Sequence, residues 1–402
     1  MGRKTLVLGY GISGQGAANL LKAQGKEFIA LDRVAKDEVE LDRSDYPLEN
    51  IDQIILSPGI SKNHPIIQRA ATMGIEVVGE IEYAFRSMQN RAIGVTGTNG
   101  KTTVTLLTTE FLNQSGIPAR AVGNVGEPLS AALLKVRPDE ILVIELSSYQ
   151  LETVRSKKLS AAAYLNLTPD HLDRYGNMRE YAKAKAKIQD CLVDEGQFFL
   201  SEDVFNDYPD LFFQRPFKML KKVDAELDLD SIRLGLPEEE NRTIAFQLAS
   251  VFGAQNNEIK TFRKPKHRIE WVAEIDQVIY LDDSKGTNID AVVYALKRLP
   301  GPIILLAGGV DKGASYAPWT ALLKEKVRHM VVYGSAAEKM ELELKESVSL
   351  MRKEKFADAA RLAKSLASKG DIVLLSPGCS SFDQFQNYEK RGEAFQEIMR
   401  GG

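Results

Sequence analysis

Short runs of aliphatic residues recur along this chain, and segments with helical periodicity separate them. The runs lie at residues 6–8, 28–31, 54–56, 93–95, 142–145, 278–281, 303–306, 330–333 and 372–375. Nearly continuous Val, Ile and Leu runs of this length are typical of parallel strands that are buried on both faces of a sheet. The pattern therefore predicts an α/β fold in which helices cover both faces of parallel sheets.

The ends of these runs carry polar, glycine-rich segments. Among them are LVLGYGISG, IILSPGIS, IGVTGTNGKT, VIELSSYQ, YLDDSKGTN, LLAGGVDKG and LLSPGCSS. Ligands of open parallel sheets bind at the carboxyl ends of the strands. The repetition therefore predicts several binding sites, each at one edge of a sheet.

The length of the chain leaves room for more than one sheet. With 402 residues, two or three domains with substantial cores are expected. The polar segment 87–91 precedes a new strand pattern, and the basic, proline-containing segment 263–268 precedes another. We therefore predict three domains, at 1–89, 90–264 and 265–402.

Composition excludes several classes of protein. Charged residues make up 27% and hydrophobic residues 44% of the chain, which fits a globular protein and not a disordered or membrane-embedded one. The formal net charge of −3 gives no general electrostatic case for a nucleic-acid partner. No apolar stretch approaches the ~18 residues of a membrane span. Two cysteines, Cys191 and Cys379, fit a reducing compartment, so we expect a cytoplasmic protein without a membrane span.

The loop after the first predicted strand reads GYGISG, from Gly9 to Gly14, and opens a helix, while Asp32 ends the next strand. Its glycines let backbone N–H groups approach a pyrophosphate at the helix N-terminus, and Asp32 could accept a hydrogen bond from a ribose hydroxyl. Taken alone, the motif leaves three interpretations open: an NAD(P) site, a site for another diphosphate-bearing nucleotide, or a turn needed for packing.

A second loop, at 96–102, reads TGTNGKT between a strand and a helix. It lacks one glycine of the strict P-loop pattern. Even so, Gly97 and Gly100 allow backbone amides to wrap a triphosphate, Lys101 can reach the transferring phosphate, and the hydroxyl of Thr102 can ligate Mg²⁺. An ATP-type site beside a Rossmann-like domain without hydride-transfer residues argues against a dehydrogenase.

Two more strand ends carry residues suited to metal binding or acid–base chemistry. Glu145 ends an apolar strand, where an unpaired carboxylate would be costly, so either a divalent cation or capping by the following serines is expected. Asp170 and His171 follow another strand and are candidate metal ligands or ligand orienters. A histidine in a loop is also common as a surface residue without a function.

Taken together, these segments resemble the Mur ligases, the ATP-dependent amino-acid-adding enzymes of peptidoglycan synthesis. The matching segments occur in the family's order from residue 9 to residue 395. They are GYGISG, SPGIS followed by HP, TGTNGKTT, GNVGEP, ELSSYQLE, NLTPDHLDRY, YAKAKAKI, KHRIEW, DDSKGTN, GGVDKG and SPGCSSFDQFQNYEKRGEAF. Within the family, the branch that adds D-glutamate is the most similar. The resemblance implies three α/β domains: a Rossmann-like N-terminal domain, a central P-loop-type mononucleotide-binding domain and a Rossmann-like C-terminal domain.

The resemblance also implies an activity, the ligation of D-glutamate to UDP-N-acetylmuramoyl-L-alanine. ATP would phosphorylate the alanyl carboxylate, the amine of D-glutamate would attack the acyl phosphate, and phosphate would leave a tetrahedral intermediate. ATP and two Mg²⁺ ions are the implied cofactors, with Mn²⁺ able to substitute. We expect a monomer.

The family's binding residues can be matched to this chain position by position. The UDP-sugar site would comprise Gly11, Ile12, Ser13, Gly14, Asp32, Ser57, Pro58, Gly59 and Asn124. The ATP site would comprise Gly97, Thr98, Asn99, Gly100, Lys101, Thr102, Thr103, Asn241, Arg268, Asp283 and Lys285. The D-glutamate site would comprise Thr287, Lys312, Ser381 and Tyr388, in which Lys312 is the natural cation for a carboxylate.

Catalytic and metal-binding roles are implied for a smaller set. The implied catalytic residues are Lys101, Glu145, His171 and Lys185, and the implied Mg²⁺ ligands are Thr102, Glu145, His171 and Lys185. Lys185 matches a family lysine that CO₂ carbamylates, which turns a cation into a carboxylate-like ligand. By its residues alone, a helix with lysines at 183, 185 and 187 usually presents a solvated face.

The alternatives are another Mur or folylpolyglutamate-type ligase and a non-catalytic nucleotide-binding relative. A folylpolyglutamate synthase would begin close to its phosphate loop, whereas here about 90 residues precede it. A diaminopimelate- or lysine-adding ligase would carry an Asp-Asn-Pro-Arg motif, which this sequence lacks. The joint presence of Lys101, Glu145, His171 and Lys185 argues against a non-catalytic relative. The segment LPEEE before Asn241 departs from the His/Asn-containing run usual in the family.

Overall fold

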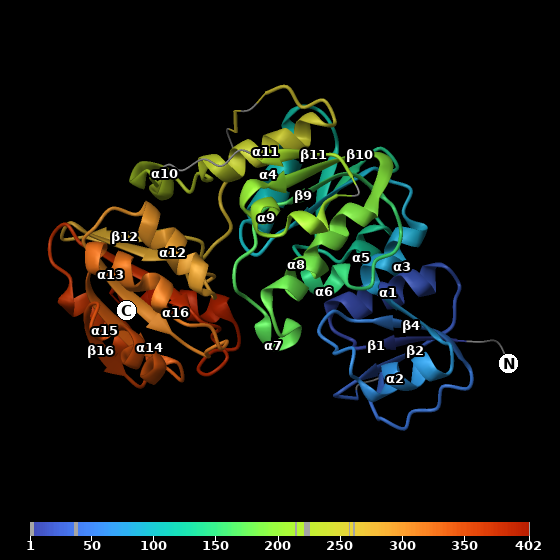
Figure 1. Ribbon diagram of the computed structural model, residues 1–402, viewed down its shortest axis with the longest axis horizontal. Coiled ribbons are helices and arrows are strands. Elements are labelled where there is room, and N and C mark those ends of the chain that lie inside the picture. Colours follow the sequence, from blue (N-terminus) through green and yellow to red (C-terminus); the bar gives the residue numbers. More distant parts are fainter. Residues whose placement is uncertain are drawn as a thin grey trace. The chain divides into compact units, whose positions relative to one another are not determined.

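The computed structural model describes residues 4–35, 39–213, 215–220, 226–256, 258–259 and 262–401. The chain forms two compact units, shown in Figure 1. The first unit comprises Met1–Leu167, Arg179–Lys222 and Asn241–Ile259. The second unit comprises Thr168–Met178, Val223–Glu240 and Lys260–Gly402. Each unit is described below by itself.

The first unit contains two parallel sheets among its described residues. In spatial order the N-terminal sheet is β3 (Val39–Leu41), β2 (Phe28–Asp32), β1 (Lys4–Leu8), β4 (Ile51–Leu56) and β5 (Glu76–Gly79). The central sheet is β11 (Phe217–Leu220), β10 (Leu192–Ser201), β9 (Leu159–Tyr164), β6 (Ala92–Thr96), β8 (Ile141–Glu145) and β7 (Ala119–Gly123). In the N-terminal sheet, strand order reverses between β1 and β4, so a crevice for a ligand is expected at their carboxyl ends.

Helices connect the strands of the first unit. Those of the N-terminal part are α1 (Ile12–Ala23), α2 (Pro65–Thr72) and α3 (Glu80–Ser87). Those of the central part are α4 (Lys101–Gln114), α5 (Leu129–Ala132), α6 (Ser148–Leu151), α8 (Met178–Ala186), α9 (Glu202–Asp207) and α11 (Glu239–Ser250), with 3₁₀ helices at Lys187–Cys191 and Pro209–Leu211.

The second unit contains one mixed sheet. In spatial order its strands are β12 (Glu270–Ile275), β13 (Val278–Asp282), β17 (Ile372–Gly378), β14 (Ile303–Gly308), β15 (Val327–Tyr333) and β16 (Ser349–Lys353). Its helices are α7 (Leu172–Tyr175), α10 (Leu229–Arg233), α12 (Ile289–Arg298), α13 (Thr320–Lys326), α14 (Ala337–Leu344), α15 (Phe356–Leu366) and α16 (Tyr388–Arg400), with a 3₁₀ helix at Ala317–Trp319.

The strands alternate their side chains between two buried cores. In β1, Leu6 and Leu8 join a core with α2, whereas Val7 joins a core with α1 and α3 on the opposite face. In β14, Leu305 joins a core with α12, α13 and α14, whereas Ile304 joins a core with α15 and α16. Successive side chains of a strand point to opposite faces of the sheet, and here both faces are buried. This explains why the sequence shows continuous aliphatic runs.

The predicted α/β fold class is confirmed, and every aliphatic run lies within an observed strand. One strand that was not predicted departs from the parallel arrangement, because β12 pairs with β13 in the antiparallel direction. The two strands are joined by Asp276 and Gln277, both with positive φ (50° and 62°), the conformation of a tight hairpin turn. Asp-Gln does not indicate such a turn, because tight hairpin turns usually contain Asn-Gly or Asp-Gly. None of the described helices has the length and apolarity needed to cross a membrane.

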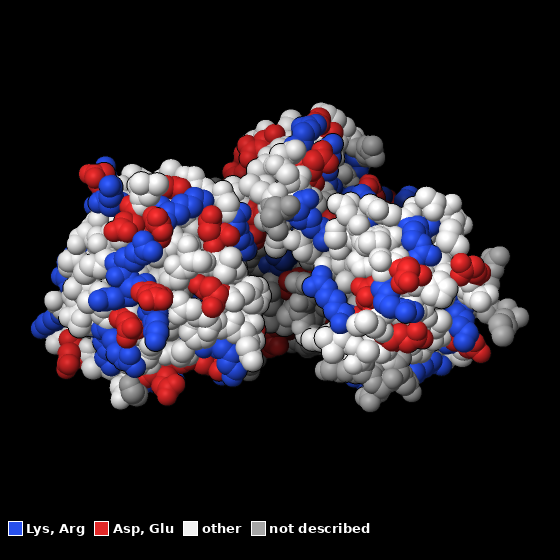
Figure 2. Space-filling view, turned by 90° about the horizontal axis from the view of Figure 1, so that it is seen from below, with Lys and Arg blue, Asp and Glu red and all other residues white. Residues whose placement is uncertain are grey.

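Surface charge is finely mixed on the face shown in Figure 2, where basic and acidic side chains are interspersed. This agrees with the small net charge of −3. On this face, electrostatic recognition therefore has to come from individual side-chain groups and not from a broad field of one sign.

Candidate active site

The loop after β1 lies at the switch point of the N-terminal sheet. Gly14 packs so tightly that a Cβ there would lie 2.0 Å from the carbonyl oxygen of Gly9. That oxygen accepts a hydrogen bond from the Ser57 hydroxyl after β4 (2.7 Å). The backbone N–H of Tyr10 donates to the carboxylate of Asp32 at the end of β2 (2.5 Å). Ser57 and Asp32, both predicted ligand residues, therefore also hold the loop in shape.

The outer side of this loop is open. The side chain of Ile12 is 74% exposed, and no atom lies within 4 Å of the place a Cβ would take at Gly11 or Gly59. Ser13 and Pro58 are partly buried. The start of α1 is thus open to an anionic ligand, as a diphosphate site requires.

Asn124 lies elsewhere in the first unit, at the end of β7. Its side-chain amide donates to Glu145 Oε1 (2.8 Å), and its backbone N–H donates to the carbonyl oxygen of Glu145 (2.9 Å). Glu145 ends β8 and is 2% exposed. Its second carboxylate oxygen, Oε2, is buried and has no hydrogen-bond partner among the described residues. A buried carboxylate with one unsatisfied oxygen fits a cation ligand.

The phosphate loop between β6 and α4 is held by a residue that the predictions missed. Asn166, after β9, accepts hydrogen bonds from the backbone N–H groups of Thr98 (3.1 Å) and Asn99 (2.9 Å), and its amide donates to the carbonyl oxygen of Asn99 (3.1 Å). Asn166 begins the segment NLTPDHLDRY, and β9 lies beside β6 in the sheet. Its position at a neighbouring strand end is the signal that could have identified it.

Two lysines converge on one carbonyl oxygen of this loop. Lys101 Nζ donates to the carbonyl oxygens of Gly97 (2.9 Å) and Thr98 (2.8 Å). Lys185 Nζ, from α8, donates to the same oxygen of Gly97 (2.8 Å). Like charges this close repel each other. An anion bound at the loop, or loss of the charge on Lys185, would relieve that repulsion.

Lys185 does not belong to a solvated face. It is 1% exposed, and its Nζ lies 4.7 Å from the ring centroid of Tyr181. Lys183, two residues earlier, is exposed and pairs with Glu180. The interpretation of all three helix lysines as surface residues is therefore wrong for Lys185.

The remaining residues predicted for this loop begin α4 or lie next to it. Thr102 is partly buried and Thr103 is buried in the first turn of α4. Gly100, with φ of 80°, caps the helix, and a Cβ there would lie 3.1 Å from Asn241 Oδ1. The structure thus brings Asn241 to the phosphate loop.

A cleft of about 1000 Å³ lies within the second unit, at the carboxyl ends of its strands. All four residues predicted for D-glutamate line it, together with Lys285 and His171. The lining residues are His171, Leu172, Lys285, Thr287, Val310, Asp311, Lys312, Gly313, Ser380, Ser381, Phe382, Asn387, Tyr388 and Glu389. Phe382 is 73% exposed and was not among the predicted site residues, although it lies in the matching segment SPGCSSFDQFQNYEKRGEAF.

The charges in this cleft are paired. Lys312 Nζ forms an ion pair with Asp170 Oδ1 (2.9 Å), and the backbone N–H of His171 donates to the same oxygen (3.0 Å). Burial raises the pKa of Asp170, but the Lys312 ammonium outweighs it and holds this pKa below its usual value. Lys285 Nζ lies over the Tyr388 ring, 4.1 Å from its centroid.

Asp283 directly follows β13 in the second unit and is buried. Burial raises its pKa to about 7, against a hydrogen bond from the Ser376 hydroxyl (2.8 Å). The neighbouring carboxylate of Asp282 raises it further, and Arg268 lowers it. Asp283 therefore titrates near neutral pH, unlike an exposed aspartate.

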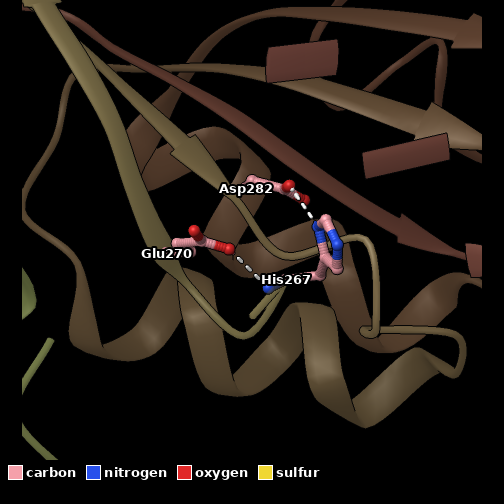
Figure 3. A group of neighbouring side chains, drawn as sticks. All are labelled: His267, Glu270 and Asp282. Carbon is pink, nitrogen blue, oxygen red and sulfur yellow. Dashed lines mark hydrogen bonds and ion pairs between the residues drawn. The ribbon is translucent and has the colours of Figure 1, made fainter. Parts of the chain in front are cut away.

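Asp282 belongs to a closed group with His267 and Glu270, shown in Figure 3. His267 Nδ1 lies 2.7 Å from Asp282 Oδ2. The backbone N–H of His267 donates a hydrogen bond to Glu270 Oε2 (2.7 Å). Burial lowers the pKa of His267, but its bond to Asp282 outweighs this and raises it. The His267 ring and the Asp282 carboxylate already bind each other. We therefore interpret the group as a structural support for the neighbouring residues Arg268 and Asp283, and not as a metal site.

Models of protein families match three parts of the chain. Residues 3–79 match the Mur ligase MurD-like N-terminal domain, 95–221 the Mur ligase middle domain, and 267–379 the Mur ligase glutamate ligase domain.

Curated relatives match over the full length. A UDP-N-acetylmuramoylalanine–D-glutamate ligase of Protochlamydia amoebophila is 40% identical over 435 residues, which cover 99% of this chain and 98% of the relative. A ligase of the same name from Chlamydia pneumoniae is 35% identical, covering 100% and 99%.

Solved structures share the fold at low sequence identity. MurC of Thermotoga maritima is 15% identical, with a TM-score of 0.59 and coverage of 99% of each chain. MurF of Acinetobacter baumannii is 15% identical, with a TM-score of 0.62 and coverage of 95% of this chain and 98% of that one. These likenesses support the three-part α/β architecture.

Proposed function

Because the chain belongs to the Mur ligase family, we propose that it is an ATP-dependent ligase that joins D-glutamate to UDP-N-acetylmuramoyl-L-alanine in peptidoglycan precursor synthesis. The observation that carries the proposal is the cleft of the second unit, where Thr287, Lys312, Ser381 and Tyr388 meet. Full-length relatives that bear this enzyme name, at 40% and 35% identity, support it. The domains proposed for the UDP-sugar, ATP and the amino acid are 1–89, 90–264 and 265–402.

The UDP-sugar is proposed to bind at the switch point of the N-terminal sheet. Backbone N–H groups at the start of α1 would hold its diphosphate, and Gly11 and Gly59 leave the space for it. Ser57 and Asp32 already shape the loop through Gly9 and Tyr10, so they would fix the site whether or not they touch the ligand. Hydride transfer plays no part in this use of a dinucleotide-type loop.

ATP is proposed to bind at the phosphate loop of the first unit. Asn166 orients the backbone amides of Thr98 and Asn99, and the Lys101 ammonium donates hydrogen bonds to carbonyl oxygens of the loop. On binding, the Lys101 ammonium would exchange a neutral carbonyl for a phosphate oxygen, a stronger partner. By the family resemblance, Arg268, Asp283 and Lys285 are further proposed ATP-binding residues.

We propose Glu145, Thr102 and Lys185 of the first unit as ligands of magnesium, and the family resemblance adds His171. The buried, unsatisfied Oε2 of Glu145 is the structural support, since such an oxygen suits a hard cation. When bound, Mg²⁺ would supply charge neutralisation, so that a triphosphate and a carboxylate can approach each other. His171 would need its imidazole uncharged, and Lys185 would need carbamylation to act as a ligand. Mn²⁺, another hard cation, would be able to substitute.

The reaction divides into two steps. The alanyl carboxylate attacks the γ-phosphorus of ATP, the bond to the bridging oxygen breaks, and ADP leaves. The amine of D-glutamate, after losing a proton, attacks the acyl phosphate carbon, and the tetrahedral intermediate expels phosphate. In the cleft, Lys312 would pair with a carboxylate of D-glutamate, and the hydroxyls of Thr287 and Ser381 would donate to its carboxylates. Excluding water from this cleft would protect the acyl phosphate from hydrolysis.

An amino-acid panel tests the proposal. Purified protein with UDP-N-acetylmuramoyl-L-alanine, ATP and Mg²⁺ should release phosphate when D-glutamate is added. Equal release with L-glutamate, with glycine or without an amino acid would overturn the substrate assignment. We further propose that the enzyme acts as a monomer in the cytoplasm, which gel filtration and fractionation of the cells would test.

A further inference from the structure

Two buried carboxylates in α3 have no role in the proposed chemistry. Glu80 and Glu82 are each 2% exposed. A buried carboxylate is costly unless hydrogen-bond donors surround it. Apart from Arg86 of α3 itself, the donors in both cases come from the central part of the first unit, whereas α3 directly continues β5 of the N-terminal sheet.

Glu80 binds the short helix α5. Its Oε1 accepts hydrogen bonds from the backbone N–H and the hydroxyl of Ser130, both at 2.6 Å. Its Oε2 is buried without a hydrogen-bond partner among the described residues, and burial raises the pKa of Glu80. Among the described residues, Ser130 therefore supplies the hydrogen bonds that hold this side chain.

Glu82 binds the segment after α6. It accepts hydrogen bonds from the backbone N–H groups of Arg155 (2.8 Å) and Ser156 (2.9 Å) and from the Ser156 hydroxyl (2.8 Å). Arg86, one helical turn away, donates to it as well (2.9 Å). Burial raises the pKa of Glu82, but these donors outweigh it and lower this pKa. Glu82 is thus an ionised, fully hydrogen-bonded link between the two parts.

Close backbone contacts surround both links. A Cβ at Gly16 in α1 would lie 2.7 Å from the hydroxyl oxygen of Ser130, the residue that Glu80 holds. A Cβ at Gly79, which caps α3, would lie 2.2 Å from the hydroxyl oxygen of Thr153. The helix α1 begins at the loop proposed for the diphosphate. Gly16, about one helical turn after the diphosphate loop, therefore packs directly against the central part.

We propose that Glu80 and Glu82 are positioning residues that fix the separation between the diphosphate loop of α1 and the phosphate loop of α4, so that the enzyme selects its substrate by length. The substrate class is a nucleoside diphosphate linked through a sugar to a terminal carboxylate. Its diphosphate end and its carboxylate end have to reach both loops at once. The inference rests on the proposed function, because a spanning substrate is needed for a fixed separation to matter.

The test separates the binding of each end from the use of the whole substrate. Glu82→Gln keeps the size of the side chain and removes its charge from four donors. We expect kcat/KM for UDP-N-acetylmuramoyl-L-alanine to fall about tenfold, the effect of weakening a buried charged hydrogen-bond group. The affinities for UDP alone and for ADP alone, measured by calorimetry, should stay within about twofold. Glu80→Gln should act in the same direction with a smaller effect.

Glu140→Gln is the matched control. Glu140 is also a buried residue whose carboxylate accepts a hydrogen bond from a backbone N–H, that of Arg137 (2.8 Å). Its other described partners, Arg120 and Asn90, also lie in the central part. It should not lower kcat/KM for the spanning substrate selectively. Unchanged kcat/KM in Glu82→Gln, or losses of UDP and ADP affinity that match the loss of turnover, would overturn the inference. A wild-type protein that binds UDP and ADP but adds no D-glutamate would instead overturn the proposed function.

Discussion

The phosphate loop of the first unit and the cleft of the second unit hold their cations in different ways. Lys101 and Lys185 both donate to a neutral acceptor, the carbonyl oxygen of Gly97, whereas Lys312 pairs with the carboxylate of Asp170. Two ammonium groups around one carbonyl oxygen favour a ligand with concentrated negative charge, such as a polyphosphate. An ion pair such as that of Lys312 and Asp170 favours a ligand that carries both a positive and a negative charge. An amino acid can offer its carboxylate to Lys312 and its ammonium to Asp170.

The largest expected effect comes from removing Lys101, the partly buried member of the lysine pair at the phosphate loop. Lys101→Ala should lower kcat by at least about 10³-fold, because its ammonium would stabilise the transferring phosphate in the transition state. The affinity for UDP, measured by calorimetry, should stay nearly intact, since the diphosphate loop lies on another sheet. Loss of both properties would show that the two sites are wrongly assigned or that the fold is damaged.

Substitution of Lys185, the buried lysine of the pair, tests whether both lysines at the phosphate loop remain positively charged. Lys185→Ala should lower turnover about 100-fold if Lys185 is a carbamylated metal ligand, the size seen when a metal-site residue is lost. Lys183→Ala, which removes an exposed lysine of the same helix, should have little effect. Wild-type protein in ¹³C-bicarbonate should show a carbamate signal by NMR that Lys185→Arg lacks. A bare amine at Lys185 in active enzyme would contradict the assignment.

The same two regions show what could be predicted from the sequence. The phosphate loop is a local motif, so Gly97, Gly100 and Lys101 were identified from one contiguous segment, and the strand and helix around it were found. Asn166 was missed because it lies 67 residues from Asn99, although its side chain shapes the loop. Hydrogen bonds between distant strand ends leave no periodic trace in a sequence.

The cleft of the second unit was predictable only through the family resemblance. Its residues come from several separate segments that the order of the strands brings together, and no spacing rule links Lys312 to Ser381. The pairing of Lys312 with Asp170 and the exposure of Phe382 needed side-chain coordinates. Burial of Lys185 among three helix lysines likewise depends on packing and not on pattern.

An intermediate effect is expected from breaking the ion pair of the cleft. Lys312→Met should raise KM for D-glutamate about 30-fold, the effect of losing a hydrogen bond to a charged group, while KM for ATP stays within about twofold. Asp170→Asn should raise KM for D-glutamate less, because a hydrogen-bonding side chain remains. The double variant should lose less than the product of the two single effects, since the residues are in contact. Strictly multiplicative effects would show that the pair does not act as a unit.

The smallest expected effect concerns the buried carboxylates, which also differ between the two regions. Glu145 accepts a hydrogen bond from the side-chain amide of Asn124. Asp283 lies beside a second carboxylate, that of Asp282, and accepts a hydrogen bond from the Ser376 hydroxyl. Burial raises the pKa of Asp283 from 3.8 to about 7 in the folded protein. Between these values the folded state binds more protons than the unfolded state, so the free energy of unfolding should fall as pH rises from about 4 to 7.

Asp283→Asn removes this ionisation and should flatten that part of the stability profile. Urea unfolding at pH 5 and pH 8 measures it: the wild-type protein should lose up to about 3 kcal/mol more than Asp283→Asn, because the two pH units between 5 and the folded-state pKa of about 7 contribute about 1.4 kcal/mol each. Asp276→Asn, at the exposed turn between β12 and β13, should keep the wild-type profile. If Asp283→Asn and Asp276→Asn behave alike, Asp283 is ionised throughout this range, and the carboxylates of the two regions do not differ in the way the geometry indicates.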